Sequence, residues 1–359
     1  MRPVDRRQFL GSLAAAGAAA SAPARAFAIG GRTAKLEGPG AIGSSNAHHP
    51  SSDAARSYSA LARAVERMRA GDKPIDAAVS GVHLVEDDPL EDGVGLGGLP
   101  NEEGVVELDA SVMDGTEHRA GAVGGLRNIQ NPSAIALAVM RRTNHLLLVG
   151  DGAFRFARDL GYPAVELLTP ASRERWLEWR AKRSDRDNWL EEREGGPTSE
   201  AVKRPPPGTV HVSCFDGKGH VGGCTSTSGL AWKIPGRVGD SAIVGAGLYA
   251  DDGAGSAGST GRGESNILIA GAHTIVEHLR AGRSPQEACL EALRRVEATC
   301  ETRLRGPDGK PSFDLAYYAL NVAGEYGCAV MRARYREGAF AVSDSRGPRH
   351  ERAAALYDE

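Results

Sequence analysis

The 359-residue sequence has little net charge, because 43 basic side chains nearly balance 46 acidic ones and leave −3. Proteins that bind nucleic acid or anionic membrane surfaces usually carry a basic excess. The sequence therefore gives no electrostatic reason to expect either partner, and we predict that the protein does not bind nucleic acid. The length is sufficient for one large domain or two ordinary ones.

Cysteines and long apolar runs are also scarce. The five cysteines are an odd number, which argues against a full disulfide framework, and no pair has zinc-ligand spacing. We therefore expect free thiols, no metal and no cofactor. No segment approaches the roughly 20 apolar residues of a membrane-spanning helix, so we expect no membrane contact in the mature form.

The N-terminus carries a targeting pattern. Arg6-Arg7 precedes an apolar stretch at residues 11–20, and small residues that suit signal cleavage follow up to Ala28. This pattern is typical of a twin-arginine export signal. We predict that residues 1–28 are removed and that the protein is periplasmic or secreted.

Hydrophobic periodicity predicts an α+β protein. Helices are expected at 51–69, 73–85, 133–142, 153–160, 265–280 and 284–297, and strands at 105–113, 145–149, 210–215, 316–321, 328–332 and 340–342. Helices and strands cluster separately, which favours stacked layers with antiparallel sheets over alternating βαβ units.

A densely charged segment occupies residues 173–207 and ends in three prolines. Its composition predicts a mobile surface loop, partly helical between Trp176 and Trp189. A break in the chain is tolerated in such a loop. The loop leads directly to Gly208-Thr209.

Thr209 is a candidate nucleophile. A threonine hydroxyl needs a nearby base, yet the sequence has no Gly-x-Ser-x-Gly motif and no evidently placed histidine. A cut before Thr209 would free its own α-amine, whose pKa of about 7.7–8.0 suits a base. Gly208 permits the strained backbone that an N-to-O acyl shift requires.

Two further groups of residues could bind a substrate or stabilise a reaction intermediate. Arg237 and Asp240 carry the charges that suit a zwitterion, with guanidinium on a carboxylate and carboxylate on an ammonium, although spacing alone favours a surface ion pair. Thr260-Gly261 is expected in a glycine-rich turn, which is either ordinary or able to donate hydrogen bonds to an oxyanion.

Two other motifs are weaker. Residues 93–98 resemble a dinucleotide fingerprint but follow an acidic stretch rather than a strand, so we predict no nucleotide site. His48-His49 could suggest a metal, but no third ligand is apparent, and a loop rim is the better interpretation.

The motifs in their order resemble a known family. They are Thr225-Ser226-Thr227, Gly236-Arg237-Val238-Gly239-Asp240-Ser241, Gly245-Ala246-Gly247 and Tyr249-Ala250-Asp251, preceded by Gly97-Gly98-Leu99-Pro100-Asn101, Leu108-Asp109-Ala110 and Met113-Asp114-Gly115. Together they resemble the glycosylasparaginases, which are N-terminal-nucleophile hydrolases. The resemblance covers nearly all of the mature chain.

The resemblance implies a four-layer αββα sandwich in a single catalytic domain. Autoproteolysis would split it into an α chain, 29–208, and a β chain, 209–359, which assemble as a dimer of αβ units. The implied site consists of Thr209 as nucleophile, Thr227 as its support, Arg237 for the substrate α-carboxylate, Asp240 for the α-ammonium, Thr260 and Gly261 as the oxyanion hole, and Val238, Gly239, Arg262 and Gly263 as further substrate contacts.

The implied reaction is hydrolysis of the amide between asparagine and N-acetylglucosamine through a β-aspartyl ester on Thr209. Two positions depart from the family: Gly208 replaces its usual Asp, and residues 45–50 offer no match for its Trp. Gly-Thr is the junction of isoaspartyl peptidases and plant-type L-asparaginases, which is the alternative enzyme. An uncleaved periplasmic amino-acid-binding protein is the alternative from another class.

Overall fold

The computed structural model describes residues 34–51, 57–183 and 208–358. The predicted export signal and residues 184–207 of the charged segment lie outside these ranges. In the described part of the charged segment, residues 173–182 belong to a helix that begins at Pro170, which agrees with the prediction that the segment is partly helical from Trp176. Pro170 takes the first helical position and the Thr169 hydroxyl accepts a hydrogen bond from Ser172 N, a combination that starts a helix.

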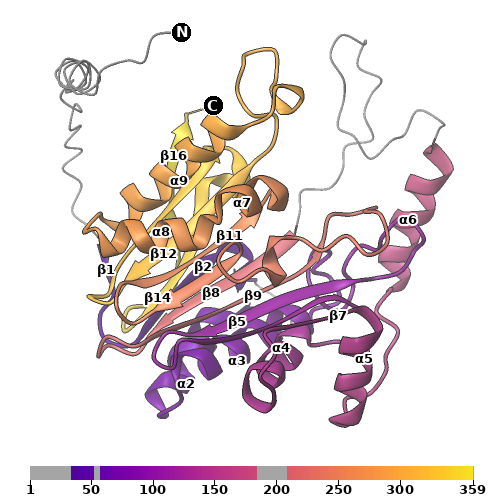
Figure 1. The fold of residues 1–359 in the computed structure, drawn as a ribbon, viewed down its shortest axis with the longest axis horizontal. Coiled ribbons are helices and arrows are strands. Elements are labelled where there is room, and N and C mark those ends of the chain that lie inside the picture. The colour runs from indigo at the N-terminus through magenta and orange to yellow at the C-terminus, as the bar shows by residue number, and fades with distance from the viewer. Residues whose placement is uncertain (1–33, 52–56, 184–207, 359) are drawn as a thin grey trace, which may run out of the picture. The chain divides into compact units, whose positions relative to one another are not determined.

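One sheet has eight strands in the order β15-β14-β2-β8-β9-β5-β6-β7 (Figure 1). Its strands are β2 (Gly40–Ser44), β5 (Leu108–Asp114), β6 (Arg119–Leu126), β7 (Leu147–Val149), β8 (Gly208–Phe215), β9 (Val221–Gly229), β14 (Ala339–Asp344) and β15 (Gly347–Arg352). All neighbouring pairs are antiparallel except β6 with β7. The strand that begins with the predicted nucleophile therefore lies inside this sheet, between β2 and β9.

The second sheet has six strands, in the order β1-β13-β12-β11-β10 with β16 paired to β13. Its strands are β1 (Ala34–Lys35), β10 (Leu248–Asp251), β11 (Gly255–Gly261), β12 (Leu315–Asn321), β13 (Glu325–Arg332) and β16 (Ala354–Tyr357). A two-stranded ribbon joins β3 (His48–His49) to β4 (Tyr58–Ser59). The mainly antiparallel pairing agrees with the sequence-based expectation.

Helices cover one face of each sheet (Figure 1). The helices of the described residues are α2 (Ala60–Arg69), α3 (Pro74–Glu86), α4 (Pro132–Arg142), α5 (Gly150–Asp159), α6 (Pro170–Lys182), α7 (Gly263–Ile269), α8 (Gly271–Arg280) and α9 (Pro285–Thr299). Of these, α2, α3, α4, α8 and α9 pack on the sheets. The first three pack against the eight-stranded sheet, and α8 and α9 against the six-stranded one, while β8 and β11 bring the two sheets together.

Two helix boundaries differ from the sequence-based expectation. The first helix begins at Ala60 rather than near residue 51, because the Ser59 hydroxyl accepts a hydrogen bond from Ala62 N and caps it. The helix expected at 265–280 is two helices, because Ala270 adopts a left-handed φ of 48° and interrupts it.

Strand β8 separates two environments by simple alternation. Val210, Val212 and Cys214 lie in the apolar core beneath α2 and α3. On the other face, the His211 ring stacks on Tyr318 of the second sheet, with ring centroids 5.7 Å apart. Because side chains alternate along a strand, Thr209 and His211 share the face toward the second sheet.

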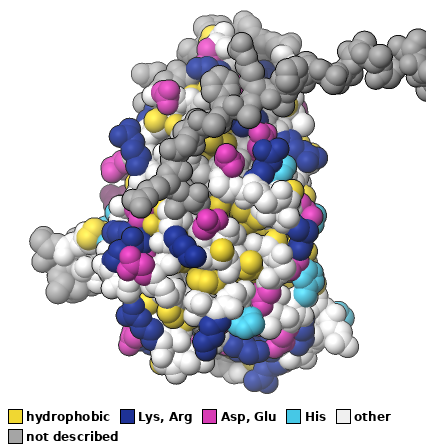
Figure 2. All heavy atoms as spheres, turned by 90° about the vertical axis from the view of Figure 1, so that its left-hand side faces the viewer, with side chains coloured by type: hydrophobic (Ala, Val, Ile, Leu, Met, Phe, Trp, Pro, Cys, Tyr) yellow, Lys and Arg dark blue, Asp and Glu magenta, His cyan; other side chains and the backbone are white. Residues whose placement is uncertain are grey.

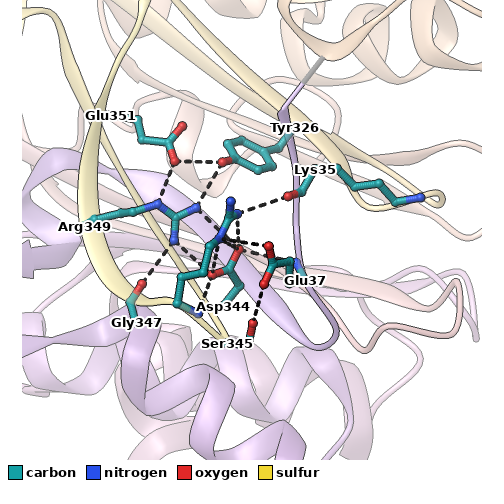
Figure 3. A network of polar contacts seen from close by, with 9 residues as sticks. Lys35, Glu37, Tyr326, Asp344, Ser345, Gly347, Arg349 and Glu351 are labelled. Carbon is teal, nitrogen blue, oxygen red and sulfur yellow. Dashed lines mark hydrogen bonds and ion pairs between the residues drawn. The ribbon is translucent and has the colours of Figure 1, made fainter. Parts of the chain in front are cut away.

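A polar network joins the β14–β15 hairpin to the other sheet (Figure 3). The fully buried Asp344 carboxylate contacts the guanidinium groups of Arg346 and Arg349. Arg349 continues to the Tyr326 hydroxyl of β13 at 3.1 Å, and Arg346 reaches the Lys35 carbonyl of β1 at 3.1 Å. Asp344 is therefore the centre of a charged contact between strands of both sheets.

The surface mixes charges of both signs. On the face that Figure 2 shows, basic and acidic side chains are interspersed with small apolar areas. Within residues 34–51, 57–183 and 208–358, no helix has both the length and the apolar character needed to cross a bilayer.

Candidate active site

Thr209 lies at the start of β8 and is almost completely buried, with 6% of its surface exposed. Its hydroxyl lies 2.8 Å from the carbonyl oxygen of Gly208 and 3.1 Å from the hydroxyl oxygen of Thr227. The candidate nucleophile is thus within hydrogen-bonding reach of the peptide group that would have to be cut.

Thr227 on β9 faces the same carbonyl. Its hydroxyl donates to Gly208 O at 2.5 Å and accepts from Gly229 N at 2.8 Å, so its position is fixed from two sides. A donor on a carbonyl oxygen draws electron density away from the carbonyl carbon. The arrangement of Thr227 therefore favours attack at Gly208 by a neighbouring hydroxyl.

Gly93 packs directly on Gly208. A Cβ atom on Gly93 would lie 2.0 Å from the Gly208 Cα, which leaves no room for a side chain. Gly93 O also accepts from Ser228 N at 2.8 Å. The glycine-rich segment 93–98 therefore packs against the strands around Thr209, which gives its glycines a structural reason that has no connection with a nucleotide.

The turn that carries Arg237 and Asp240 is held by two carboxylates, Asp109 in β5 and Glu107 immediately before it. Asp109 accepts from Gly239 N at 2.9 Å and from Gly125 N at 2.8 Å. Glu107 accepts from Gly236 N at 3.1 Å. Gly236 and Gly239 of the turn are thus bound to β5 and the residue that precedes it, which fixes the backbone that carries the two charged side chains.

Arg237 pairs with Glu264, not with Asp240. Its Nε and Nη2 atoms lie 3.0 Å and 2.8 Å from Glu264 Oε1. Burial opposes ionisation of Glu264, but Arg237 and Arg262 outweigh it and lower the pKa of that carboxyl. The guanidinium also lies beside Gly229 and Gly239, where any Cβ atom would contact Nη1.

Asp240 is buried beneath the turn. Its Oδ2 atom accepts from the Ser259 hydroxyl and from Asn266 Nδ2, both at 2.7 Å. Burial raises the pKa of Asp240, and these two donors and Arg237 counteract part of that effect. A simple surface ion pair between Arg237 and Asp240, the alternative interpretation of their spacing, does not fit this geometry.

Thr260 and Gly261 are the last two residues of strand β11. The prediction from the sequence, that they lie in a turn, was therefore wrong. They pair with Ala316 and Leu315 of β12. The small residues are needed because the strand lies close to its neighbours: a Cβ atom on Gly261 would lie 2.5 Å from the Asp314 carbonyl oxygen. The Thr260 hydroxyl lies 2.8 Å from the Tyr318 hydroxyl.

His211 was missed by sequence reasoning. Its Nδ1 lies 2.8 Å from the Thr225 hydroxyl and its Nε2 lies 2.8 Å from the Ser213 hydroxyl. Complete burial lowers the pKa of His211 to about 3, so the ring is neutral near pH 7. With both nitrogens engaged, His211 is a fixed part of the layer between the sheets.

The remaining sequence candidates lie as follows. Val238 contacts Gly124, because a Cβ atom on that glycine would lie 3.0 Å from Val238 Cγ1. Gly263 lies on Asp240 and Arg237, since its Cβ would be 2.6 Å from Asp240 Oδ1 and 3.1 Å from Arg237 Nη2. Gly263 thus lies between the Arg237 and Asp240 side chains, whereas Val238 packs on Gly124 of β6.

The His48-His49 pair belongs to the β3–β4 ribbon. The His48 ring lies 5.1 Å from the His350 ring, and His49 stacks on Tyr58. Across residues 34–51, 57–183 and 208–358, no group of three or more His, Cys, Asp or Glu side chains is arranged to hold a metal ion. Cys214, Cys224, Cys289, Cys300 and Cys328 all carry free thiols, as the sequence suggested.

Known proteins resemble this chain over most of its length. Residues 37–304 match the family described as asparaginase. A protein of Elizabethkingia miricola named N(4)-(beta-N-acetylglucosaminyl)-L-asparaginase is 40% identical over 283 residues, which cover 78% of this chain and 77% of the relative. Its namesake in Mus musculus is 34% identical, covering 77% of this chain and 83% of the relative, and that of Rattus norvegicus is 36% identical, covering 73% and 78%.

Proposed function

The chain belongs to the asparaginase family, and on this premise we propose that it is an amidohydrolase that cleaves the amide between asparagine and N-acetylglucosamine. Relatives that share 34–40% of their residues with it over most of both chains bear the name of that activity. The contact of the Thr209 hydroxyl with Gly208 O and Thr227 is the observation that carries the proposal.

The chain first has to cut itself. The Thr209 Oγ1 atom attacks the Gly208 carbonyl carbon, the peptide nitrogen becomes the free amine of Thr209, and water hydrolyses the resulting ester. The Thr227 hydroxyl, 2.5 Å from Gly208 O, stabilises negative charge on that oxygen. The product is an α chain ending at Gly208 and a β chain beginning with the nucleophile.

The new N-terminus then acts on the substrate. The amine of Thr209 removes the hydroxyl proton while Oγ1 attacks the side-chain carbonyl of the glycosylated asparagine. The amide nitrogen takes up a proton and leaves as the glycosylamine. Water cleaves the β-aspartyl ester on Thr209 and releases aspartate.

Charged groups hold the amino-acid part of the substrate. Arg237 binds the α-carboxylate and the buried Asp240 binds the α-ammonium. The Thr260 hydroxyl and the Gly261 N–H receive the oxyanion at the end of β11. Val238, Gly239, Arg262 and Gly263 form the adjoining wall, which is consistent with the positions of Gly239 and Gly263 beside the Arg237 guanidinium.

The wider assignments follow from the same family. We assign the two sheets and their helices to the four-layer αββα sandwich, supported by α2, α3 and α4 on one sheet and α8 and α9 on the other. We also propose export through the twin-arginine signal at residues 1–28, and assembly as a dimer of αβ units.

Purified protein tests the proposal directly. N-terminal sequencing and intact mass are expected to show one chain that begins at Thr209. Thr209→Ala is expected to remain uncut and inactive. Thr209→Ser is expected to keep part of the self-cleavage and part of the hydrolytic activity. An uncut protein that hydrolyses the substrate at full rate would contradict this mechanism.

A substrate panel separates the alternatives. Gly208 is the junction residue of isoaspartyl peptidases and plant-type asparaginases, so N-acetylglucosaminyl-asparagine should be compared with β-aspartyl dipeptides and asparagine. We expect the highest kcat/KM on the glycosylated substrate, and a clear preference for β-aspartyl dipeptides would reassign the enzyme. Uncut protein that binds aspartate without turnover would instead indicate a binding protein.

A further inference from the structure

Strand β12 carries two adjacent tyrosines that are both fully buried, on opposite faces of the strand. Tyr317 lies in the apolar cluster beneath α8 and α9, and Tyr318 lies in the cluster between the two sheets. A phenol hydroxyl buried in an apolar environment needs a hydrogen-bond partner. Each of these hydroxyls finds its partner in a different part of the candidate site.

Tyr318 reaches the end of β11. Its hydroxyl lies 2.8 Å from Thr260 Oγ1, and its ring stacks on His211 with an angle of 15° between the planes. Gly258 makes room for that stack, because a Cβ atom there would lie 2.1 Å from His211 Nδ1. His211 is in turn fixed by Thr225 at 2.8 Å. The ring of Tyr318 is therefore held on a rigid surface while its hydroxyl contacts Thr260.

Tyr317 reaches the buried carboxylate. Its hydroxyl donates to Asn266 Oδ1 at 2.7 Å, and Asn266 Nδ2 donates to Asp240 Oδ2 at 2.7 Å. Gly271 leaves space for these two hydrogen bonds, because a Cβ atom at that position would lie 1.9 Å from Asn266 Oδ1 and 2.5 Å from the Tyr317 hydroxyl oxygen. The Tyr317 bond fixes which side of the Asn266 amide faces Asp240.

We propose that Tyr318 is a positioning residue for the Thr260 hydroxyl, and that Tyr317, through Asn266, is a positioning residue for Asp240. The inference rests on the proposed function, in which Thr260 serves the oxyanion and Asp240 the substrate ammonium. The two faces of β12 thus orient two different groups. Tyr318 orients Thr260, which acts on the transition state, and Tyr317 orients Asp240, which binds the substrate in the ground state.

The direction of the Tyr318 hydrogen bond gives the physical reason. A phenol is a stronger proton donor than an aliphatic alcohol, so Tyr318 donates to Thr260 Oγ1. The single proton of Thr260 is then left to donate to a developing oxyanion. Burial raises the pKa of Tyr318 far above neutrality, so the phenol keeps its proton under all working conditions.

The two faces predict two different kinetic defects. Tyr318→Phe keeps the ring and removes only the hydroxyl, which should lower kcat about 10-fold and change KM less than about two-fold. Tyr317→Phe should raise KM about five-fold and change kcat less, because Asn266 loses the partner that orients it. The inhibition constant for L-aspartate, which offers only the amino-acid charges, should rise in Tyr317→Phe and stay constant in Tyr318→Phe.

Tyr326→Phe is the matched control. It removes another tyrosine hydroxyl from the same sheet, one that is bonded at 2.8 Å to Glu351 rather than to a site residue, and should leave kcat and KM unchanged. All rates are normalised to the cut fraction on a denaturing gel, and thermal unfolding is measured for each variant. This separates incomplete processing and simple loss of stability from a positioning effect.

The outcomes are distinguishable. Unchanged kcat in Tyr318→Phe, or equal changes of kcat and KM in both variants, would overturn the positioning proposal while active wild-type enzyme upholds the proposed function. Wild-type protein without amide hydrolysis would refute the proposed function. Calorimetric binding of L-aspartate to wild type and Tyr317→Phe would still test the Tyr317–Asp240 connection, which equal affinities would refute.

Discussion

Gly208 and Gly93 touch through their backbones, since a Cβ atom on Gly208 would lie 2.1 Å from the Gly93 Cα. This contact accounts for the glycine that precedes Thr209, the candidate nucleophile, where the family resemblance implies an aspartate. The chain brings the 93–98 segment so close to β8 that the position before Thr209 has no space for a carboxylate.

We therefore predict that restoring the family residue impairs this protein. Gly208→Asp should overpack the contact, destabilise the fold by about 1–3 kcal/mol and leave most of the chain uncut. The uncut fraction on a denaturing gel and the midpoint of thermal unfolding measure the two effects. Gly152→Asp, at a position with open space around it, is the control. Complete cutting of Gly208→Asp at the wild-type rate would show that the contact does not constrain the junction.

A second prediction concerns the carboxylate beneath the substrate turn. Asp109→Asn replaces one acceptor of the Gly239 and Gly125 N–H groups with an amide donor, so the turn that bears Arg237 should lose its fixed position. We expect KM to rise about 10-fold with a smaller change in kcat, measured by steady-state kinetics on the cut enzyme. Asp114→Asn, which removes turn hydrogen bonds at the other end of β5, should leave KM unchanged. An unaltered KM in Asp109→Asn would mean that the turn does not need this carboxylate.

A third prediction concerns acid stability. In the unfolded chain His211 takes up a proton below about pH 6.5, whereas in the folded protein burial lowers its pKa to about 3. Unfolding therefore binds a proton in this window, and the free energy of unfolding falls as the pH falls, by up to about 1.4 kcal/mol per pH unit. Denaturant unfolding of His211→Gln should show a shallower decline from pH 6 to pH 4 than the wild type. Equal slopes would show that His211 is protonated in the folded state.

A fourth prediction concerns the network in Figure 3. Arg346 and Arg349 outweigh the effect of burial and hold the pKa of Asp344 well below its usual range. A lowered carboxyl pKa stabilises the fold above the unfolded pKa of about 3.9, and this contribution is lost as the pH falls below it. Asp344→Asn should cost ~2 kcal/mol at pH 7, and the difference from wild type should shrink below pH 4. Asp308→Asn, in an exposed pair with Lys310, should change little.

Local patterns made much of this architecture predictable. The alternation from Val210 to Cys214 indicated a strand, and Pro74 with Asp76 indicated the start of α3, because these signals act within a few residues. The start of α2 was misplaced because serines at several positions offer the same capping chemistry, and only the contact of Ser59 with Ala62 N decides between them.

The site was predictable where chemistry is encoded in a short motif and not where it depends on distant partners. The structure brings Thr209 next to Thr227, as the motif order suggested. It also brings Arg237 close enough to Asp240 to act on the pKa of that carboxyl. His211 escaped notice because Tyr318, more than one hundred residues away, supplies its stacking surface. Thr260 was expected in a turn because glycines disfavour strands, yet close packing against β12 requires small residues in that strand.

The position of β8 within its sheet determines the order of folding and cleavage in the proposed maturation. β2, β5, β6 and β7 precede the junction in sequence, whereas β8, β9, β14 and β15 follow it, and the two groups interleave across eight strands. Two separately made polypeptides would have to thread into each other to reproduce that order. If the chain cuts itself as proposed, the intact chain must therefore fold first and be severed afterwards, and the two halves would then stay together without a covalent link until the sheet itself unfolds.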